Sequence, residues 1–144
     1  MNAYADTSFL LSLYAPDANS AAAAATMAKL RPPLPFTPLQ QAEFRNATRL
    51  RVFRKELTPA ERDAVLEQLT NDLAGGVLMP TPLAWSDVWR EAERLSARHA
   101  ETTGARTMDI LHVAAARTLG ATELLTFDNR QRAVAQAEGL RVKP

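Results

Sequence analysis

Two patterns of apolar positions alternate along the chain. Short apolar runs, which are typical of strands, occupy residues 3–5, 34–37, 77–79, 122–127 and 140–142. Longer stretches with apolar residues at helical spacing lie between them and predict helices over residues 9–14, 21–30, 39–55, 58–74, 83–100, 108–119 and 128–138. The repeated order of strand and helix predicts parallel strand pairing and an α/β sandwich, with one domain spanning residues 1–144.

Helix boundaries are marked by capping residues. The segment Thr58-Pro59-Ala60-Glu61 is a capping box with proline at the first helical position, and Gly75-Gly76 ends the same helix. We expect Thr107 to cap the helix over residues 108–119 in a similar way.

Two aromatic residues and a histidine have more than one interpretation. Trp85, Trp89, Ala92 and Leu95 recur at helical spacing, which predicts that they lie on the inner face of their helix. The tryptophan pair is more typical of a core than of base stacking or a partner groove. His112 is interpreted as a hydrogen-bonded helix residue near the core, with contact to a site or a phosphate as the alternative.

Composition narrows the possible chemistry. The chain has no cysteine and two histidines, which excludes disulfide scaffolds, thiolate zinc sites and multi-histidine metal sites. Any bound metal would therefore be held by carboxylates, which favour magnesium or manganese. The formal net charge of +1 is too small for a protein that coats nucleic acid by charge alone. Most of the 17 basic residues are arginines, whose forked donors suit phosphate.

Membrane association is not expected. No run approaches 18 apolar residues, and no basic segment precedes the first short apolar run. The sequence therefore predicts a cytoplasmic protein without a membrane-spanning helix.

Four acidic residues stand out by their positions. Asp6 and Asp128 each follow a predicted strand, and the carboxyl ends of parallel strands are where α/β sheets bind ligands. Glu43 shares a helix face with Ala47 and Leu50, and Asp109 lies in line with Val113 and Ala116. Both are therefore predicted to point toward apolar surroundings, where a carboxylate is costly unless it is neutralised. A shared divalent cation would neutralise several acids at once.

Each acid also has a structural interpretation. Asp128 with Gln131 resembles a capping box, and Asp6 is suited to capping the helix that follows it. Asp109 lies in a first turn, where the helix dipole favours a carboxylate. Glu43 is a candidate for an ion pair with Arg54 or Arg106. For any one of these acids taken alone, the structural role is the favoured interpretation. For the four acids together, a functional site is the favoured interpretation.

The same residues resemble the motifs of the PIN-domain family. Asp6-Thr7-Ser8-Phe9-Leu10-Leu11 resembles the opening motif, and Ala42-Glu43-Phe44 resembles the glutamate motif that follows the second strand. The segments 108–116 and 124–128 resemble the third and fourth motifs. Order and spacing match over essentially the whole chain, and the most similar subgroup is the VapC-type toxin ribonucleases.

This resemblance implies a fold, an activity and a set of site residues. The implied fold is a three-layer α/β/α sandwich with a short parallel central sheet. The implied activity is hydrolysis of RNA phosphodiester bonds with Mg²⁺ or Mn²⁺. Asp6, Asp109 and Asp128 would be metal ligands, and Glu43 would complete the catalytic set.

Further residues and partners follow from the same resemblance. Ser8 and Thr126 would support the acids through their hydroxyls. Arg45 and Arg49, four apart on one helix, would hold the RNA backbone with Arg130 or Arg132; the alternative for each arginine is an ordinary solvated surface. Family members often carry a second aspartate where this chain has Arg130, which removes one optional ligand. The implied partners are a cognate antitoxin and a second copy of the chain in a homodimer, with DNA contacted only through the antitoxin.

Two other classes of function are open to the sequence. One is a catalytically weak PIN-like module that binds RNA or a protein, although the intact acids oppose it. The other is a phosphatase or a phospho-acceptor domain. The segment Asp6-Thr7-Ser8 lacks the second aspartate of the common aspartyl-phosphatase motif, and the acid pair and strand-end lysine of receiver domains are also missing.

Overall fold

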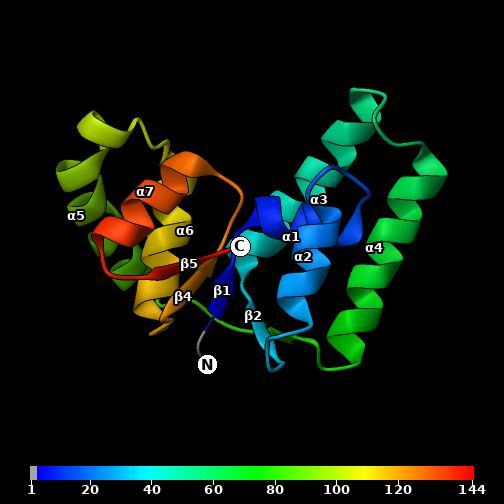
Figure 1. Cartoon of the computed structure of the whole chain (residues 1–144), viewed down its shortest axis with the longest axis horizontal. Helices are drawn as coiled ribbons and strands as arrows, with labels where there is room; N and C mark the ends of the chain where they lie inside the picture. Colours follow the sequence, from blue (N-terminus) through cyan, green and yellow to red (C-terminus); the bar gives the residue numbers. More distant parts are fainter. Residues whose placement is uncertain (1–2) are drawn as a thin grey trace. The chain divides into compact units, whose positions relative to one another are not determined.

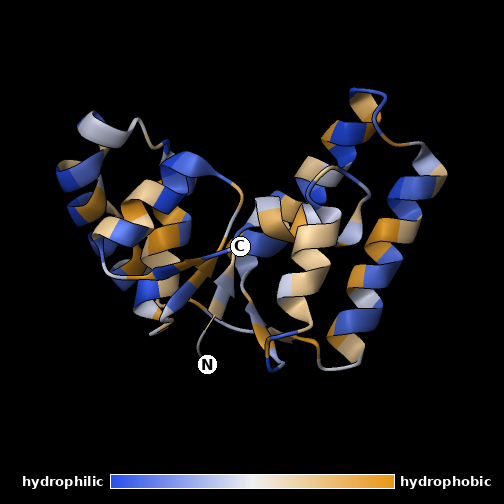
Figure 2. Cartoon of the chain, in the orientation of Figure 1, coloured by the Kyte–Doolittle hydropathy of each residue, from blue (hydrophilic) through white to orange (hydrophobic). Residues whose placement is uncertain are grey.

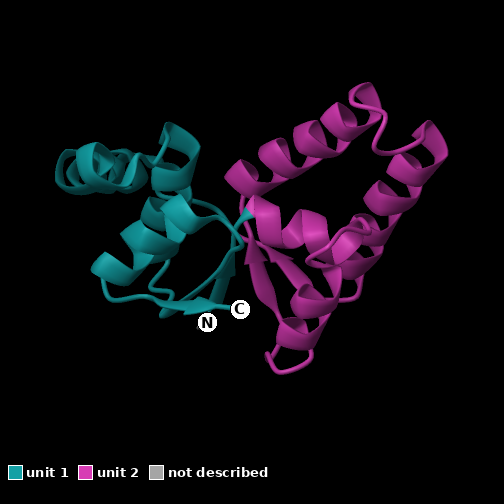
Figure 3. Ribbon diagram, turned by 45° about the horizontal axis from the view of Figure 1, so that its top comes forward, with its two compact units in different colours: residues 1–6, 82–144 teal, residues 7–81 magenta. Residues whose placement is uncertain are grey.

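The chain folds into two compact units. The structure, a computed structural model, describes residues 3–144. Unit 1 combines residues 1–6 with 82–144, and unit 2 spans residues 7–81; Figure 3 colours them separately. Both units carry helices and parallel strands, so the predicted α/β class is confirmed. The prediction of one domain over residues 1–144 stays a prediction.

Unit 1 is built on a three-stranded parallel sheet in the order β1–β4–β5. Its elements are β1 (Ala3–Ala5), α5 (Trp85–Thr103), α6 (Thr107–Thr118), β4 (Glu123–Leu125), α7 (Asn129–Ala137) and β5 (Arg141–Lys143). The three helices pack against one another and gather on one side of this sheet (Figures 1 and 3). Every strand starts at the same edge, so all the carboxyl ends meet at the opposite edge.

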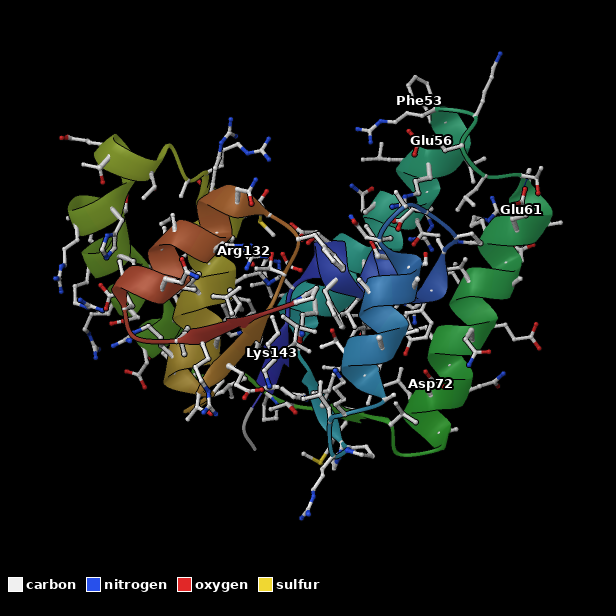
Figure 4. All side chains as sticks on the ribbon, viewed as in Figure 1. Phe53, Glu56, Glu61, Asp72, Arg132 and Lys143 are labelled. Atoms are coloured by element: carbon white, nitrogen blue, oxygen red, sulfur yellow. The ribbon has the colours of Figure 1, made fainter. Side chains whose placement is uncertain are left out.

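Unit 2 contains two parallel strands and four helices. Its elements are α1 (Thr7–Tyr14), α2 (Ser20–Met27), β2 (Leu34–Phe36), α3 (Pro38–Phe53), α4 (Pro59–Ala74) and β3 (Leu78–Pro80). Helix α1 packs against α2, α3 and α4, and α3 forms a hairpin with α4. Figure 4 labels Phe53, Glu56 and Glu61 around the turn of this hairpin.

Side-chain caps fix the starts of α3 and α4. The hydroxyl of Thr58 accepts a hydrogen bond from the backbone of Glu61 at 3.1 Å, and the Glu61 carboxylate accepts one from the backbone of Thr58 at 3.0 Å. The predicted capping box is therefore confirmed. Thr37 and Gln40 form a second, reciprocal box at the start of α3. Both boxes satisfy backbone donors that a helix leaves unpaired in its first turn.

The centre of unit 1 is α6. Its residues from Asp109 to Ala116 are all buried, and Figure 2 shows α6 largely in apolar colours, whereas α4 mixes polar and apolar turns. A helix that is apolar on nearly every side is expected where other elements surround it. The polar residues Asp109 and His112 are therefore exceptional within it.

An ionic cluster joins the three helices of unit 1. The side chain of Glu138, just after α7, is only 5% exposed. Its carboxylate lies 2.7 Å from Arg94 and 2.6 Å from His99 on α5, and 3.6 Å from Arg117 on α6. Burial alone would raise the pKa of Glu138, but hydrogen bonds from Arg94 and His99 and the charges of Arg94 and Arg117 outweigh it and lower the pKa to about 2.

The predicted elements are all present in residues 3–144, with ends shifted by a few residues. The inner face predicted for the helix over residues 83–100 is wrong in part. Ala92 and Leu95 are buried as expected, but Trp85 and Trp89 are 37% and 55% exposed and stack on each other with ring centroids 5.9 Å apart. The buried stripe of α5 instead begins at Val88.

Trp89 lines a groove of about 560 Å³ between α5 and α6. The sequence pattern alone could not show that Trp85 and Trp89 are exposed, because the same spacing suits a core face and a groove wall.

Within residues 3–144, no helix is both long enough and apolar enough to cross a bilayer.

Candidate functional site

Asp6 and Asp128 are connected through the hydroxyl of Thr126. Thr126 donates a hydrogen bond to the Oδ2 atom of Asp6 at 2.6 Å, and the backbone N–H of Asp128 donates one to the same hydroxyl at 2.9 Å. Asp6 is 2% exposed and Thr126 is fully buried. The structure therefore brings together two of the predicted acids and one of the predicted supporting hydroxyls.

The strand register explains why Asp6 and Thr126 lie next to each other. Ala5 pairs with Leu125, and the backbone N–H of Asp6 bonds to the carbonyl of Leu125 at 3.0 Å. Asp6 and Thr126 therefore follow the last paired residues of neighbouring parallel strands and lie on one face of the sheet, as do Tyr4 and Leu124. The prediction that Asp6 and Asp128 lie at one sheet edge is confirmed.

Asp128 is also the N-cap of α7. Its Oδ1 atom accepts a hydrogen bond from the backbone N–H of Gln131 at 2.9 Å. The reciprocal half of the predicted capping box is absent, because the Oε1 atom of Gln131 is buried without a hydrogen-bond partner. The N-cap uses one oxygen of the Asp128 carboxylate, so the structural and the ligand interpretations of this residue remain compatible.

Asp109 is 93% buried in the first turn of α6, since its exposed fraction is 7%. Its Oδ2 atom accepts a hydrogen bond from the backbone N–H of Arg106 at 2.8 Å, and the Arg106 Nε atom lies 3.8 Å away. The expected cap by Thr107 is wrong, because α6 begins at Thr107 and the capping contact is made by Asp109. A carboxylate at the third position of a helix can reach back to the backbone N–H of the residue that precedes the helix.

The course of α6 places Asp109 toward the same sheet edge as Asp6. Helix α6 ends at Thr118 and β4 begins at Glu123, so the short turn between them reverses the chain direction. Figure 1 shows α6 and β4 running in opposite senses. The first turn of α6, with Asp109, therefore lies toward the carboxyl ends of the strands.

The donor chemistry at this edge suits a hard divalent cation. The carboxylates of Asp6, Asp109 and Asp128 offer only oxygen, which is what Mg²⁺ and Mn²⁺ prefer. In the arrangement described for residues 3–144, no three histidine, cysteine or acidic side chains are gathered tightly enough to hold a metal. Asp109 and Asp128 each turn one oxygen toward a helix amide instead. The residues present fit the metal by ligand type.

The remaining predicted site residues on α1 and α3 belong to unit 2. Glu43 is half-buried, but the buried stripe of α3 is formed by Leu39, Gln40, Phe44 and Thr48. The predicted apolar face that joins Glu43 to Ala47 and Leu50 is therefore wrong, and Leu50 is 39% exposed. Ser8 is half-buried in the first turn of α1.

The candidate RNA-binding arginines have different surroundings. Arg49 and Arg130 are exposed, on α3 and in the first turn of α7, whereas Arg45 is half-buried with an Nε atom that lacks a hydrogen-bond partner. Arg132 donates hydrogen bonds to the backbone carbonyls of Thr126 and Pro144, at 3.3 and 3.1 Å. Arg132 is therefore occupied beside the site, and Figure 4 labels it on α7.

One residue near the acids was not singled out by its sequence pattern. Tyr4 is fully buried, and its hydroxyl lies 2.9 Å from the Nδ1 atom of His112. The core interpretation of His112, which is 1% exposed, is thereby confirmed. The available signal was the position of Tyr4 two residues before Asp6, because alternate residues of a strand share a face.

Fold and site together define an α/β protein with acids at the carboxyl edge of a short parallel sheet. A family model described as the PIN domain matches residues 3–137. The chain therefore belongs to the PIN-domain family. No curated protein sequence matches it.

Solved structures show the same fold over nearly the whole chain. VapC20 of Mycobacterium tuberculosis, a sarcin–ricin loop cleaving toxin, is 22% identical with a TM-score of 0.72, covering 99% of this chain and 100% of that one. FitAcB of Neisseria gonorrhoeae is 19% identical with a TM-score of 0.69, covering 99% and 96%. VapBC2 of Rickettsia felis, bound to a promoter DNA fragment, is 12% identical with a TM-score of 0.70, covering 99% and 98%. At these identities the likeness shows the fold.

Proposed function

We propose that this PIN-domain protein is a Mg²⁺- or Mn²⁺-dependent endoribonuclease. The observation that carries the proposal is the link from Asp6 through the Thr126 hydroxyl to the backbone of Asp128, with Asp109 toward the same edge. Buried carboxylates repel an anionic phosphodiester, so a cation has to bind before RNA does. When bound, the metal would polarise the scissile phosphate and lower the pKa of a coordinated water.

Each predicted residue has a role in this proposal. Asp6, Asp109 and Asp128 hold the metal, and the Thr126 hydroxyl fixes the direction of the Asp6 carboxylate. Glu43 and Ser8 are assigned by their motifs, Glu43 as the acid that orients the attacking water and Ser8 as a supporting hydroxyl. Arg45, Arg49 and Arg130 are assigned to the phosphates of the RNA backbone. Arg132 is assigned to structure, because two backbone carbonyls already use its guanidinium.

The biological setting in the proposal is a toxin–antitoxin pair. Among the structural neighbours described above, FitAcB and VapBC2 are named as pairs or complexes, and VapC20 is named as a toxin. The cognate antitoxin would hold the toxin inactive, and contact with DNA would occur only through the antitoxin. A homodimer of this chain belongs to the same proposal. Co-expression with the product of a neighbouring small gene, followed by size-exclusion chromatography, tests both associations.

Cleavage of RNA tests the activity. Purified protein is incubated with a labelled structured RNA in Mn²⁺ or in EDTA. We expect cleavage only with Mn²⁺, and a loss of about 100-fold or more in Asp6→Asn, since the loss of a ligand should exceed the effect of losing a supporting group. Asp87→Asn on the exposed surface of α5 is the matched control and should keep wild-type activity.

The contrary result would favour the binding-module alternative. RNA that is retained by the wild-type protein in a gel-shift assay but never cleaved, with or without Mn²⁺, would contradict the nuclease proposal. Cleavage that survives both EDTA and Asp6→Asn would instead indicate a contaminating nuclease.

A further inference from the structure

The bond between Tyr4 and His112 is a buried polar contact between β1 and α6. The two side chains are 0% and 1% exposed, the Tyr4 hydroxyl lies 2.9 Å from Nδ1 of His112, and the ring centroids are 5.9 Å apart. The contact joins β1 to α6 across 108 residues of sequence. Separation of the partners would leave buried polar atoms without their bond, so the contact defines one arrangement strongly.

This contact lies in register with the acids. Tyr4 and Asp6 are two residues apart on one face of β1, because alternate residues of a strand point the same way. His112 and Asp109 are three residues apart on one face of α6. Helix α6 runs opposite to β4, and β4 is parallel to β1. The direction from Tyr4 to Asp6 along β1 and the direction from His112 to Asp109 along α6 therefore both lead toward the carboxyl ends of the strands. The Tyr4–His112 pair lies next to Asp6 and Asp109, further from that edge of the sheet.

The composition of α6 shows why such a contact matters. The second half of its buried segment is Ala114, Ala115 and Ala116, whose small side chains interlock little with a neighbour, whereas the first half also carries the larger Ile110, Leu111 and Val113. Close complementarity of apolar side chains helps to specify a single packing arrangement, and the alanine run supplies little of it. A buried polar pair also specifies register, because a shifted arrangement would leave both polar groups without this bond.

We infer that Tyr4 and His112 are positioning residues for the carboxylate site. Their bond sets the height of α6 against β1, and so holds Asp109 level with Asp6 for a shared divalent cation. The inference rests on the proposed function for the identity of the metal site. It makes a separate claim, which concerns metal affinity and not cleavage.

Manganese titration by calorimetry, with the chain of residues 1–144, tests this inference. Tyr4→Phe keeps the ring and removes the hydroxyl, and we expect the Kd for Mn²⁺ to rise about tenfold, as is typical for the loss of a group that orients a ligand. His112→Leu should do the same. His112→Asn places an amide near the position of Nδ1, and should restore affinity to within about threefold of wild type.

Tyr14→Phe is the matched control for a general loss of stability. Like Tyr4, Tyr14 forms a side-chain hydrogen bond through its hydroxyl, but it donates to Asp72 at 2.5 Å and lies within unit 2. The Mn²⁺ affinity of the Tyr14→Phe variant should equal that of wild type even if the Tm of this variant is lower. Circular dichroism verifies that each variant is folded at the titration temperature.

The outcomes separate the two proposals. Wild-type affinity in Tyr4→Phe and His112→Leu, or an equal loss in Tyr14→Phe, would overturn the positioning role while leaving the nuclease intact. Manganese binding that weakens as expected, in a protein that cleaves no RNA, would overturn the nuclease alone. A wild-type chain that binds no Mn²⁺ would overturn both.

Discussion

At the scale of single residues, one hydroxyl connects two elements of the candidate site. Thr126 both donates to Asp6 and accepts from the backbone of Asp128, so its hydroxyl acts as donor and acceptor at once. A charged acceptor makes the first of these bonds a strong one. The orientation of the Asp6 carboxylate therefore depends on a side chain that bears no charge and would not itself be a metal ligand.

Replacement of this hydroxyl tests its role. Thr126→Val keeps the shape of the side chain but removes the bond to Asp6, so we expect Mn²⁺ affinity to fall about tenfold. Thr126→Ser keeps the hydroxyl and should remain within about threefold of wild type. Calorimetric titration measures both. Equal affinities in the valine and serine variants would show that the hydroxyl does not orient the acid.

At the scale of elements, Glu138 fastens the end of α7 to α5 and α6. Arg94 and Arg117 also bond to Glu91, at 2.7 and 2.6 Å, so the cluster extends along α5. Arg98 lies 3.6 Å from Glu138, so the cluster contains three arginines and two carboxylates, and each acid has more than one cationic partner. Removal of the most buried acid would leave several guanidinium groups facing one another without their shared counter-charge.

The pKa of Glu138 gives a prediction about acid stability. This pKa is about 2 in the folded chain against an ordinary value of 4.5, so the stabilisation is present above pH 4.5 and is lost as the pH falls toward 2. Glu138→Gln should lower the free energy of unfolding at pH 7 by about 2 kcal/mol, a value reduced for the partial exposure of its partners. Urea unfolding at several pH values measures the difference between the two proteins.

The way in which this stability difference changes with pH tests the role of the Glu138 charge. The difference in the free energy of unfolding between wild type and Glu138→Gln should become smaller as the pH falls from 4.5 to the folded pKa of about 2. Glu93→Gln, at an exposed position of α5, should follow the wild-type curve throughout. A gap that stays constant with pH would contradict the role given to the Glu138 charge.

At the scale of the whole molecule, local signals predicted the elements well. Alternating apolar patterns and the Thr58 capping box identified the strands and helices, because caps and periodicity act over a few residues. The placement of Asp6 and Asp128 at one sheet edge followed from strand ends in a parallel sheet. Long-range partners could not be predicted in this way. The contact between Tyr4 and His112, the cluster around Glu138 and the exposure of Trp89 depend on which helices pack together, which local pattern does not specify.

The acids show the same limit at the candidate site. Sequence position indicated correctly that Asp109 is buried and that Asp128 caps a helix. It gave the wrong buried face for Glu43, because Ala47 and Leu50 suggested an apolar stripe that differs from the buried residues of α3. Capping and metal binding use the same carboxylates, so position alone cannot separate the two roles.

Asp109→Asn separates them directly. The amide oxygen of asparagine can still accept the bond from the backbone of Arg106, so the cap remains while the negative charge is removed. The measurement is the single-turnover rate of RNA cleavage at saturating Mn²⁺, with Asp63→Asn on the exposed face of α4 as the control. We predict a loss of about 100-fold or more for Asp109→Asn, with an unchanged Tm and an unchanged rate in the control. A folded Asp109→Asn protein that cleaves RNA at the wild-type rate would contradict the assignment of this carboxylate site as the centre of a metal-dependent nuclease.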